Sequence, residues 1–421
     1  MNRTMRVILC IIVLFSITRK LNADHLRPKG ESIFDNICKR QTLTDGFFGL
    51  SDRSADSGIE IGFGVTNIYQ QNIHGGIGAH RHAGRNSGSY DLEVLADLDK
   101  LLGLENAGFY IHAEGGWTDT EGIDGVSVGS AFGVNADAKG NRSLDVIEIF
   151  YEGTIFKDSL NLMAGKIDLT CVFDGSAFAD CECTQFMNAA LVDNPTIPFP
   201  DYSLAVVLSY EPTDSWYVMG GVADAQADGR ETGLRTAFYG EDYFLYMLET
   251  GIKPELESAK GTLQGTYRIG LWNDPQPKAN SDSVKNYRDD IGFYFSCDQM
   301  LAKENAELED SQGLGAFFRY GYANSRKNDI DNFWSGGFQY QGLVEGRGDD
   351  VLGVGFAQGI FSNHASATYT EDYESALELY YNALVTPWAN ISPSIQYITN
   401  PGGDKTVSDA VVLGLRAQIM F

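Results

Sequence analysis

The feature that most constrains this chain is a two-residue period in hydrophobicity, which recurs along most of its length. In the last eleven residues the odd positions run apolar from Val411 to Phe421, whereas the even positions include Gly414, Arg416 and Gln418. Because successive side chains of a strand point to opposite faces, such a segment predicts a strand with one apolar and one polar face. Lipid on one side and a wet lumen on the other would satisfy both faces.

About sixteen segments share this character, and many are close to the roughly 9–11 residues that a tilted strand needs to cross a bilayer. They are 59–71, 88–101, 107–117, 143–155, 159–168, 203–211, 215–224, 243–252, 261–273, 289–299, 311–323, 330–341, 350–361, 373–386, 391–399 and 408–421. An even strand number is typical of single-chain bacterial barrels. The pattern therefore predicts an all-β fold, a 16-stranded antiparallel transmembrane β-barrel formed by residues 57–421.

The connections between these segments alternate in length. Several alternate ones are short, at 102–106, 156–158, 212–214 and 387–390, and those between them are mostly longer, at 72–87, 118–142, 169–202, 225–242 and 274–288. Short periplasmic turns and long extracellular loops are typical of outer-membrane barrels. Two connections depart from this pattern, because 300–310 is long for a periplasmic turn and 324–329 is short for an outer loop.

The two ends of the chain predict export to the outer membrane. Met1–Ala23 has two early arginines, an uncharged run over Val7–Ile17 and a small residue at its end, which is the pattern of a cleaved signal peptide. Residues 24–56 show no period of two, and we expect them in the periplasm or against the lumen. Phe421 ends an amphipathic strand, the form in which barrel proteins reach the outer-membrane assembly machinery.

Composition excludes other classes of protein. The formal net charge is −26, from 31 basic and 57 acidic residues, whereas nucleic-acid binding needs a basic surface. A hydrophobic content of 43% is too high for a disordered acidic chain. Beyond the signal segment, the sequence holds no apolar stretch of the roughly 20 residues that a membrane-spanning helix needs.

Cysteine usage fits an exported protein only in part. Of six cysteines, Cys10 lies in the signal segment, which leaves five, and an odd number cannot be fully paired within one chain. Cys171, Cys181 and Cys183 share one predicted loop, where we expect one disulfide without assigning the partner of Cys171. A metal site is the weaker alternative, because Cys-x-Cys without a nearby histidine is narrower than the usual zinc-ligand spacing.

An ordered series of short motifs extends this picture. It comprises Gly165-Lys166-Ile167-Asp168, Phe173-Asp174, Ala177-Phe178-Ala179, Thr184-Gln185-Phe186, Asn188–Pro195, Leu208–Asp214, Glu378-Leu379-Tyr380-Tyr381, Thr386-Pro387-Trp388, Gln396-Tyr397-Ile398 and Asn400–Gly403. In these motifs the chain resembles the carbohydrate-selective porin (OprB-like) family, over roughly residues 43–421. The start, Leu43–Leu50, is similar to the family's Leu-Thr-Gly-Asp-Trp-Gly-Gly, with Asp and Gly transposed and Phe in place of Trp.

The resemblance implies a sixteen-stranded outer-membrane barrel that passes monosaccharides and related polyols by diffusion. It also implies long loops that fold inward and narrow the lumen. The three cysteines of the 169–202 loop depart from the family, where other residues are expected, so the family's selectivity does not carry over directly.

Strand parity places a set of charged side chains on the lumen face. They are Asp91, Glu93, His112, Glu114, Glu148, Glu249, Arg268, Arg319, Glu378 and Arg416. Arginines that oppose carboxylates suit the passage of a neutral, hydroxyl-rich solute, which must be bound weakly enough to leave. For each residue, a solvated wall ion pair is the alternative to sugar contact.

The loop 169–202 is the predicted constriction, because long loops without their own secondary structure are usually functional. We expect Asp174, Asp180, Glu182 and Gln185 to face the pore, Phe173, Phe178 and Phe186 to pack the loop against the wall, and Lys166 and Asp168 to meet it from the strand end.

The sequence gives little support to an enzyme. The histidines form no His-Glu-x-x-His motif, and the Gly75–Gly78 run before His80 and His82 lacks a P-loop lysine at the right spacing. We expect no cofactor and no metal. The predicted function is passive carbohydrate diffusion across the outer membrane, in contact with its lipid. The predicted barrel is compatible with a homo-oligomer. A general or ion-selective diffusion porin, and less well an exported soluble all-β glycan-binding protein or hydrolase, are the alternatives.

Overall fold

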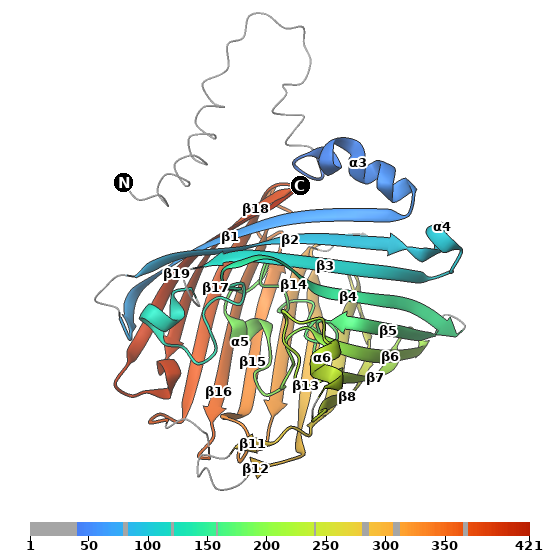
Figure 1. The fold of residues 1–421 in the computed structure, drawn as a ribbon. Coiled ribbons are helices and arrows are strands. Elements are labelled where there is room, and N and C mark those ends of the chain that lie inside the picture. The colour runs from blue at the N-terminus through green and yellow to red at the C-terminus, as the bar shows by residue number, and fades with distance from the viewer. Residues whose placement is uncertain are drawn as a thin grey trace, which may run out of the picture.

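The computed structural model describes residues 40–78, 83–118, 122–156, 159–239, 241–279, 286–305, 312–364 and 369–421. Within these residues the chain forms a closed antiparallel β-barrel (Figure 1). The predicted signal segment, Cys38 and the histidines at 80 and 82 lie outside the described residues.

The wall of the barrel contains sixteen strands among the described residues, if β8 and β9 are counted as one. Both pair with β10, and only Lys253 and Pro254 separate them. The wall strands are β1 (Ile59–Gly76), β2 (Gly84–Asp97), β3 (Ala107–Thr118), β4 (Arg142–Phe156), β5 (Leu160–Ile167), β6 (Ser203–Thr213), β7 (Trp216–Asp224), β8 (Phe244–Ile252), β9 (Glu255–Ser258), β10 (Gly261–Asp274), β13 (Asp290–Lys303), β14 (Gly313–Tyr322), β15 (Ile330–Gln341), β16 (Val351–Phe361), β17 (Tyr373–Thr386), β18 (Ala389–Thr399) and β19 (Ser408–Met420). The predicted strand number and antiparallel arrangement are confirmed.

Closure comes from the pairing of the first strand with the last. β1 and β19 are antiparallel neighbours, with Gly64 opposite Met420. The amide of Phe421 also donates to the carbonyl of Phe63 at 2.9 Å, and the amide of Leu43 donates to the carbonyl of Met420 at 2.8 Å. The helix α3 (Asp45–Asp56) follows this contact and lies beside β1 (Figure 1).

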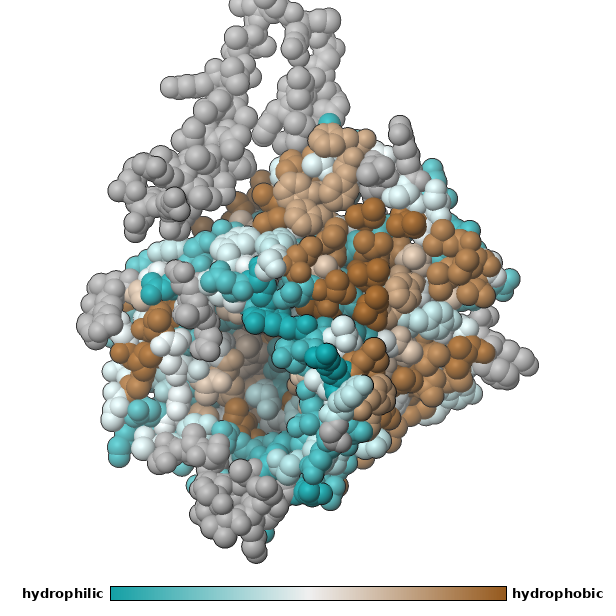
Figure 2. Space-filling model, in the orientation of Figure 1, coloured by the Kyte–Doolittle hydropathy of each residue, from teal (hydrophilic) through white to brown (hydrophobic). Residues whose placement is uncertain are grey.

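The alternation of side chains follows the predicted parity. On β19, Leu413 and Leu415 point outward and are 41% and 43% exposed, whereas Arg416 points inward and is fully buried. Such outward apolar side chains recur around the barrel, and they form brown areas on its flank in Figure 2. Lipid would cover this belt in a membrane. Among the described residues, no helix is long and apolar enough to cross a bilayer.

The loops differ in length between the two ends of the barrel, broadly as predicted. Two residues, 214–215, join β6 to β7, whereas 168–202 joins β5 to β6. Two predictions are corrected. The connection at 72–87 is much shorter, because β1 continues to Gly76 and β2 begins at Gly84. The strand predicted to reach residue 101 ends at Asp97, whose carboxylate caps the short helix α4 (Leu98–Leu102) by accepting from the amides at 99 and 100.

Two long loops fold into the lumen and supply much of the apolar core. In the loop 122–141, which contains a π-helical turn η2 (Asp124–Val128), Ile123 and Val128 pack with inward side chains of β17–β19. In the loop 168–202, which contains α5 (Ala189–Val192), Phe186 and Leu191 pack on inward aromatic side chains of β14, β15 and β17. Phe173 of the same loop joins a cluster on the opposite strands, including Tyr294 of β13.

The remaining short elements lie in other connections. α6 (Leu234–Phe238) lies between β7 and β8, the hairpin β11 (Lys278–Ala279) and β12 (Asn286–Tyr287) follows β10, and a 3₁₀ turn η3 (Pro401–Gly403) lies between β18 and β19. The barrel is therefore a wall whose interior is narrowed by its own loops.

Candidate constriction and permeation site

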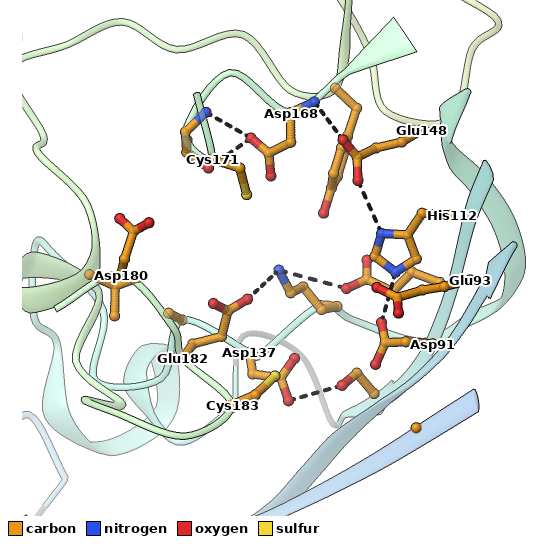
Figure 3. Close-up of a pocket in the computed structure, with 18 of the residues that line it drawn as sticks. Asp91, Glu93, His112, Asp137, Glu148, Asp168, Cys171, Asp180, Glu182 and Cys183 are labelled. Atoms are coloured by element: carbon orange, nitrogen blue, oxygen red, sulfur yellow. Dashed lines mark hydrogen bonds and ion pairs between the residues drawn. The ribbon is translucent and has the colours of Figure 1, made fainter. Parts of the chain in front are cut away.

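A cavity of about 580 Å³ remains between the inward loops and the wall formed by β2, β3 and β4. Figure 3 shows carboxylates from the strands and from both loops converging on it. Its acidic lining residues are Asp91, Glu93, Glu114, Asp137, Glu148, Asp168, Asp180, Glu182, Asp193 and Asp201, and its basic or titratable nitrogen groups are His112, Lys139 and Arg142. The described lining is thus strongly acidic.

On the wall side, three neighbouring strands present a carboxylate–imidazole–carboxylate row (Figure 3). His112 of β3 lies 3.2 Å from Asp91 of β2 through Nε2 and 3.2 Å from Glu148 of β4 through Nδ1. An imidazole can donate to two carboxylates at once only when both ring nitrogens carry protons. This row fixes the three side chains relative to one another across the three strands. All three residues also line the cavity.

On the loop side, Lys139 connects three elements. Its Nζ lies 3.7 Å from Glu114 of β3 and 3.4 Å from Glu182 of the loop 168–202. Burial would lower the pKa of the Lys139 amine, but the carboxylates around it, Glu182 foremost, outweigh burial and raise this pKa well above its ordinary value. The amine therefore stays charged and holds the two loops to the wall.

Two aspartates of the loop 168–202 titrate near neutral pH. Burial raises the pKa of Asp180 to about 7, even though Arg319 lies 3.0 Å away and opposes the shift. Burial also raises the pKa of Asp193 to about 6, and the nearby Glu182 carboxylate adds to the effect. The negative charge of the cavity thus depends on pH in the neutral range.

Two arginines predicted to face the pore instead hold the loop, and this corrects the sequence-based assignment. Arg319 donates to the carbonyls of Leu191 and Val192 at 3.2 and 2.7 Å, and also to the carbonyl of Asp174 and the carboxylate of Asp180. Arg416 donates to the carbonyls of Glu182 and Gln185 at 2.5 and 2.9 Å. Both side chains are on the lumen face, as parity predicts, but the loop covers them.

Two glutamates predicted to face the pore also bind the loop 168–202 instead. Glu378 accepts from the amides of Met187 and Asn188 at 3.0 and 2.9 Å, and Glu249 accepts from the amide of Asp174 at 2.9 Å. Both are at most 1% exposed. Buried polar and charged groups need such hydrogen-bond partners. These glutamates and arginines therefore anchor the loop and do not line the cavity.

The other predicted residues divide between cavity and scaffold. Glu114, Glu148, Asp168, Asp180 and Glu182 line the cavity. By contrast, Lys166 donates to the carbonyl of Gly229 at 2.6 Å, Asp174 accepts from Asn194, Gln185 accepts from the amides of Asp180 and Cys181, and Arg268 pairs with Asp298 in the wall at 2.7 Å. The predicted packing of Phe173, Phe178 and Phe186 against the inner wall is present.

Several lining residues were not predicted. Asp137 and Lys139 lie in the long connection 118–142, for which no individual pore residue was predicted, and Asp193 and Tyr202 lie in the far half of the constriction loop. Tyr110 could have been found, because it shares strand parity with His112 and Glu114 on β3.

The cysteines of the constriction loop are free thiols in the structure, as is Cys297. A hydrogen bond between the Cys181 and Cys183 thiols lowers the pKa of Cys181 below its ordinary value and raises the pKa of Cys183. The predicted disulfide of this loop is thus not formed here, and the partner of Cys171 stays unassigned. Among the described residues, no group of three or more cysteine, histidine or acidic side chains is arranged to hold a metal.

A closed sixteen-stranded barrel with an apolar outer belt, inward loops and a remaining polar cavity defines a diffusion porin of the outer membrane. Residues 81–421 match the carbohydrate-selective porin, OprB family. The chain belongs to that family, and it is an outer-membrane porin for carbohydrates.

Several known porins are similar to this chain in sequence or in structure. The chain is 23% identical over 394 residues to Porin B of Pseudomonas aeruginosa, covering 83% of this chain and 85% of the relative. It is 24% identical over 243 residues to the putative porin QuiX of Acinetobacter baylyi, covering 51% and 54%. The high-pH structure of Pseudomonas putida OprB superposes with a TM-score of 0.80 at 20% identity, covering 91% of this chain and 99% of that one. Its low-pH structure superposes with a TM-score of 0.59.

Proposed function

We propose that this porin passes small neutral carbohydrates of monosaccharide size through the cavity between β2–β4 and the loop 168–202, and that its role is passage and not catalysis. The observation that carries the proposal is the cavity itself, about 580 Å³ in volume and lined by hydrogen-bonding groups from β2, β3, β4 and β19 and from two loops. This volume is in the range of small-molecule sites. The lining groups can replace water around sugar hydroxyls, and the absence of a deep apolar slot among the described lining residues favours release.

The experiment is sugar-dependent swelling of liposomes that contain the purified protein. We expect rapid swelling in glucose and xylose and a sharp decrease with disaccharides and larger oligosaccharides. A protein that inserts as a barrel but passes all these sugars at rates set only by their diffusion would contradict the size limit and leave a general porin.

The acidic lining supports a second property, a preference for cations over anions. Ten carboxyl groups and three nitrogen groups line the cavity, and rings of carboxylates favour cations in channels. Sugar acids and sugar phosphates would therefore pass more slowly than neutral sugars of the same size. A reversal potential measured across a KCl gradient tests this, and a selectivity for chloride would contradict it.

We also propose the cellular context that the sequence predicts. The short turns face the periplasm and the long loops face the exterior, Met1–Ala23 is removed on export, and the amphipathic end at Phe421 is delivered to the barrel assembly machinery. Outer-membrane lipid covers the apolar belt. The barrel is also compatible with assembly into a homo-oligomer. N-terminal sequencing of the mature protein and native mass spectrometry in detergent test the cleavage and the oligomeric state.

A further inference from the structure

A second cavity, of about 440 Å³, lies at the short-turn end of the barrel. Its lining comes from the ends of β1 to β5 and includes Asp97, Glu152 and Asn161. It therefore lies along the same part of the wall as the first cavity, displaced toward the other mouth of the barrel.

Tyr110 of β3 belongs to the lining of both cavities. Of the described residues that line either cavity, Tyr110 alone lines both. Its hydroxyl donates to Glu93 Oε1 at 2.8 Å, and its ring lies 5.2 Å from the ring of Phe150 on β4, measured between centroids. The hydrogen bond to Glu93 and the ring contact with Phe150 together fix the orientation of the Tyr110 ring.

On the side of the lumen formed by β14–β19, the two inward loops fill the space. The loop 168–202 is bonded to β14, β17 and β19 through Arg319, Glu378 and Arg416, and an apolar cluster seals it to β14–β17. The loop 122–141 packs on β17–β19. The loop 168–202 also packs on β4–β8 through Phe173 and Ile197. The two cavities nevertheless remain as open spaces along β2–β5 in the described interior.

We propose that solutes cross this porin off the barrel axis, along the β2–β5 wall, and that the face of Tyr110 is the surface over which a sugar ring passes between the two cavities. This inference rests on the proposed function. It adds the route that the solute takes and one residue that determines specificity. One face of a pyranose carries mainly C–H groups, which suit an aromatic ring, while the acidic groups nearby can accept from its hydroxyls. A single aromatic contact of this kind is weak, which permits release.

The first test narrows the junction. We expect Tyr110→Trp to lower both glucose-driven liposome swelling and single-channel conductance, because the larger ring occupies the connection. The matched control is Tyr246→Trp, since Tyr246 lies on β8 and points outward, 50% exposed. A folded Tyr110→Trp barrel that conducts ions and glucose like the wild type would overturn the route.

The second test separates an aromatic surface from simple obstruction and does not depend on the tryptophan variant. Glucose and the linear polyol sorbitol have the same carbon number, but only glucose presents a ring face. We expect Tyr110→Ala to lower the glucose-to-sorbitol flux ratio at least about twofold. Tyr110→Phe, which keeps the ring and loses the bond to Glu93, should preserve the ratio.

An unchanged ratio in Tyr110→Ala, with increased flux of both solutes, would overturn the role of the aromatic face. These outcomes are distinct from failure of the proposed function. In that case the wild-type protein itself would show no size-limited glucose flux, whatever residue occupies position 110.

Discussion

Among single residues, Lys139 has the largest expected effect on selectivity. It is a charged amine held between Glu114 and Glu182 in a cavity whose lining is mostly acidic. Lys139→Met should therefore make the cavity more negative and increase the permeability ratio of potassium to chloride, by a factor of about 2 to 5 if the site behaves as a ring of carboxylates. Reversal potentials in a KCl gradient measure this ratio.

Lys139→Arg is the matched control, because it keeps the charge at the same position. We expect it to retain the wild-type ratio within experimental error. A Lys139→Met protein that forms channels with the wild-type ratio would show that this amine does not contribute to the potential along the route.

The pH dependence of selectivity is also set by individual residues. With pKa values of about 7 and about 6, Asp180 and Asp193 are ionised above these values and take up protons as the pH falls through them. The cavity is consequently least negative at low pH. We expect the preference for cations to decrease between pH 8 and pH 5, as measured by reversal potential at each pH.

Asp180→Asn removes the group that titrates first. Its selectivity at pH 8 should resemble that of the wild type at lower pH, and its remaining pH dependence should be centred nearer 6. If the substitution leaves the midpoint of the wild-type curve in place, Asp180 is not the titrating group.

At the scale of elements, the constriction depends on how the loop 168–202 is held. Without Arg319, the buried carbonyls of Asp174, Leu191 and Val192 lose a donor, and leaving a buried acceptor unsatisfied costs about 1–3 kcal/mol. Because the wall hydrogen bonds remain, we expect Arg319→Met to release the loop and leave the barrel folded. Larger ion conductance, measurable disaccharide swelling and faster proteolysis within 168–202 would report this release.

Arg347→Met provides the comparison for that variant. Arg347 pairs with Asp350 in the turn between β15 and β16 and has no bond to the loop. Its conductance and size limit should equal those of the wild type. An Arg319→Met channel that keeps the disaccharide cut-off would show that the apolar cluster around Phe186 and Leu191 holds the loop without the arginine.

The same element shows what sequence could and could not predict. A strand has a fixed period, so parity correctly placed Glu114, Glu148 and Arg319 on the inner face. Parity contains no information about a loop that folds onto that face. It therefore could not distinguish Glu114, which lines the cavity, from Arg319, which the loop covers. Lys139 was missed for a related reason, since its position depends on loop packing and on two ion pairs distant in sequence.

At the scale of the whole molecule, the apolar belt and the closed wall predict a protein that requires detergent and resists unfolding. We expect an unheated sample in detergent to migrate faster on a gel than a boiled one, because the intact barrel is compact. A sample that is soluble without detergent and migrates identically under both conditions would contradict the barrel.

Assembly can be separated from transport at the same scale. The ring of Phe421 lies 5.4 Å from that of Phe63 between centroids and does not line either cavity. Phe421→Ala should therefore reduce the amount of protein in the outer membrane, while the channels that do form keep wild-type glucose flux. Phe48→Ala, at an 88% exposed position, is the control and should leave the amount unchanged.

The pairing of Gly64 with Met420 also determines when the sheet can be completed. Contacts between such distant segments form slowly, because a long chain must be brought together before the contact stabilises it. Strands β1 to β18 can pair with their sequence neighbours as the chain is delivered, but the outer edge of β1 stays open until β19 arrives. An open edge is a template for pairing with another chain, so the interval before closure is when this protein is most prone to aggregate.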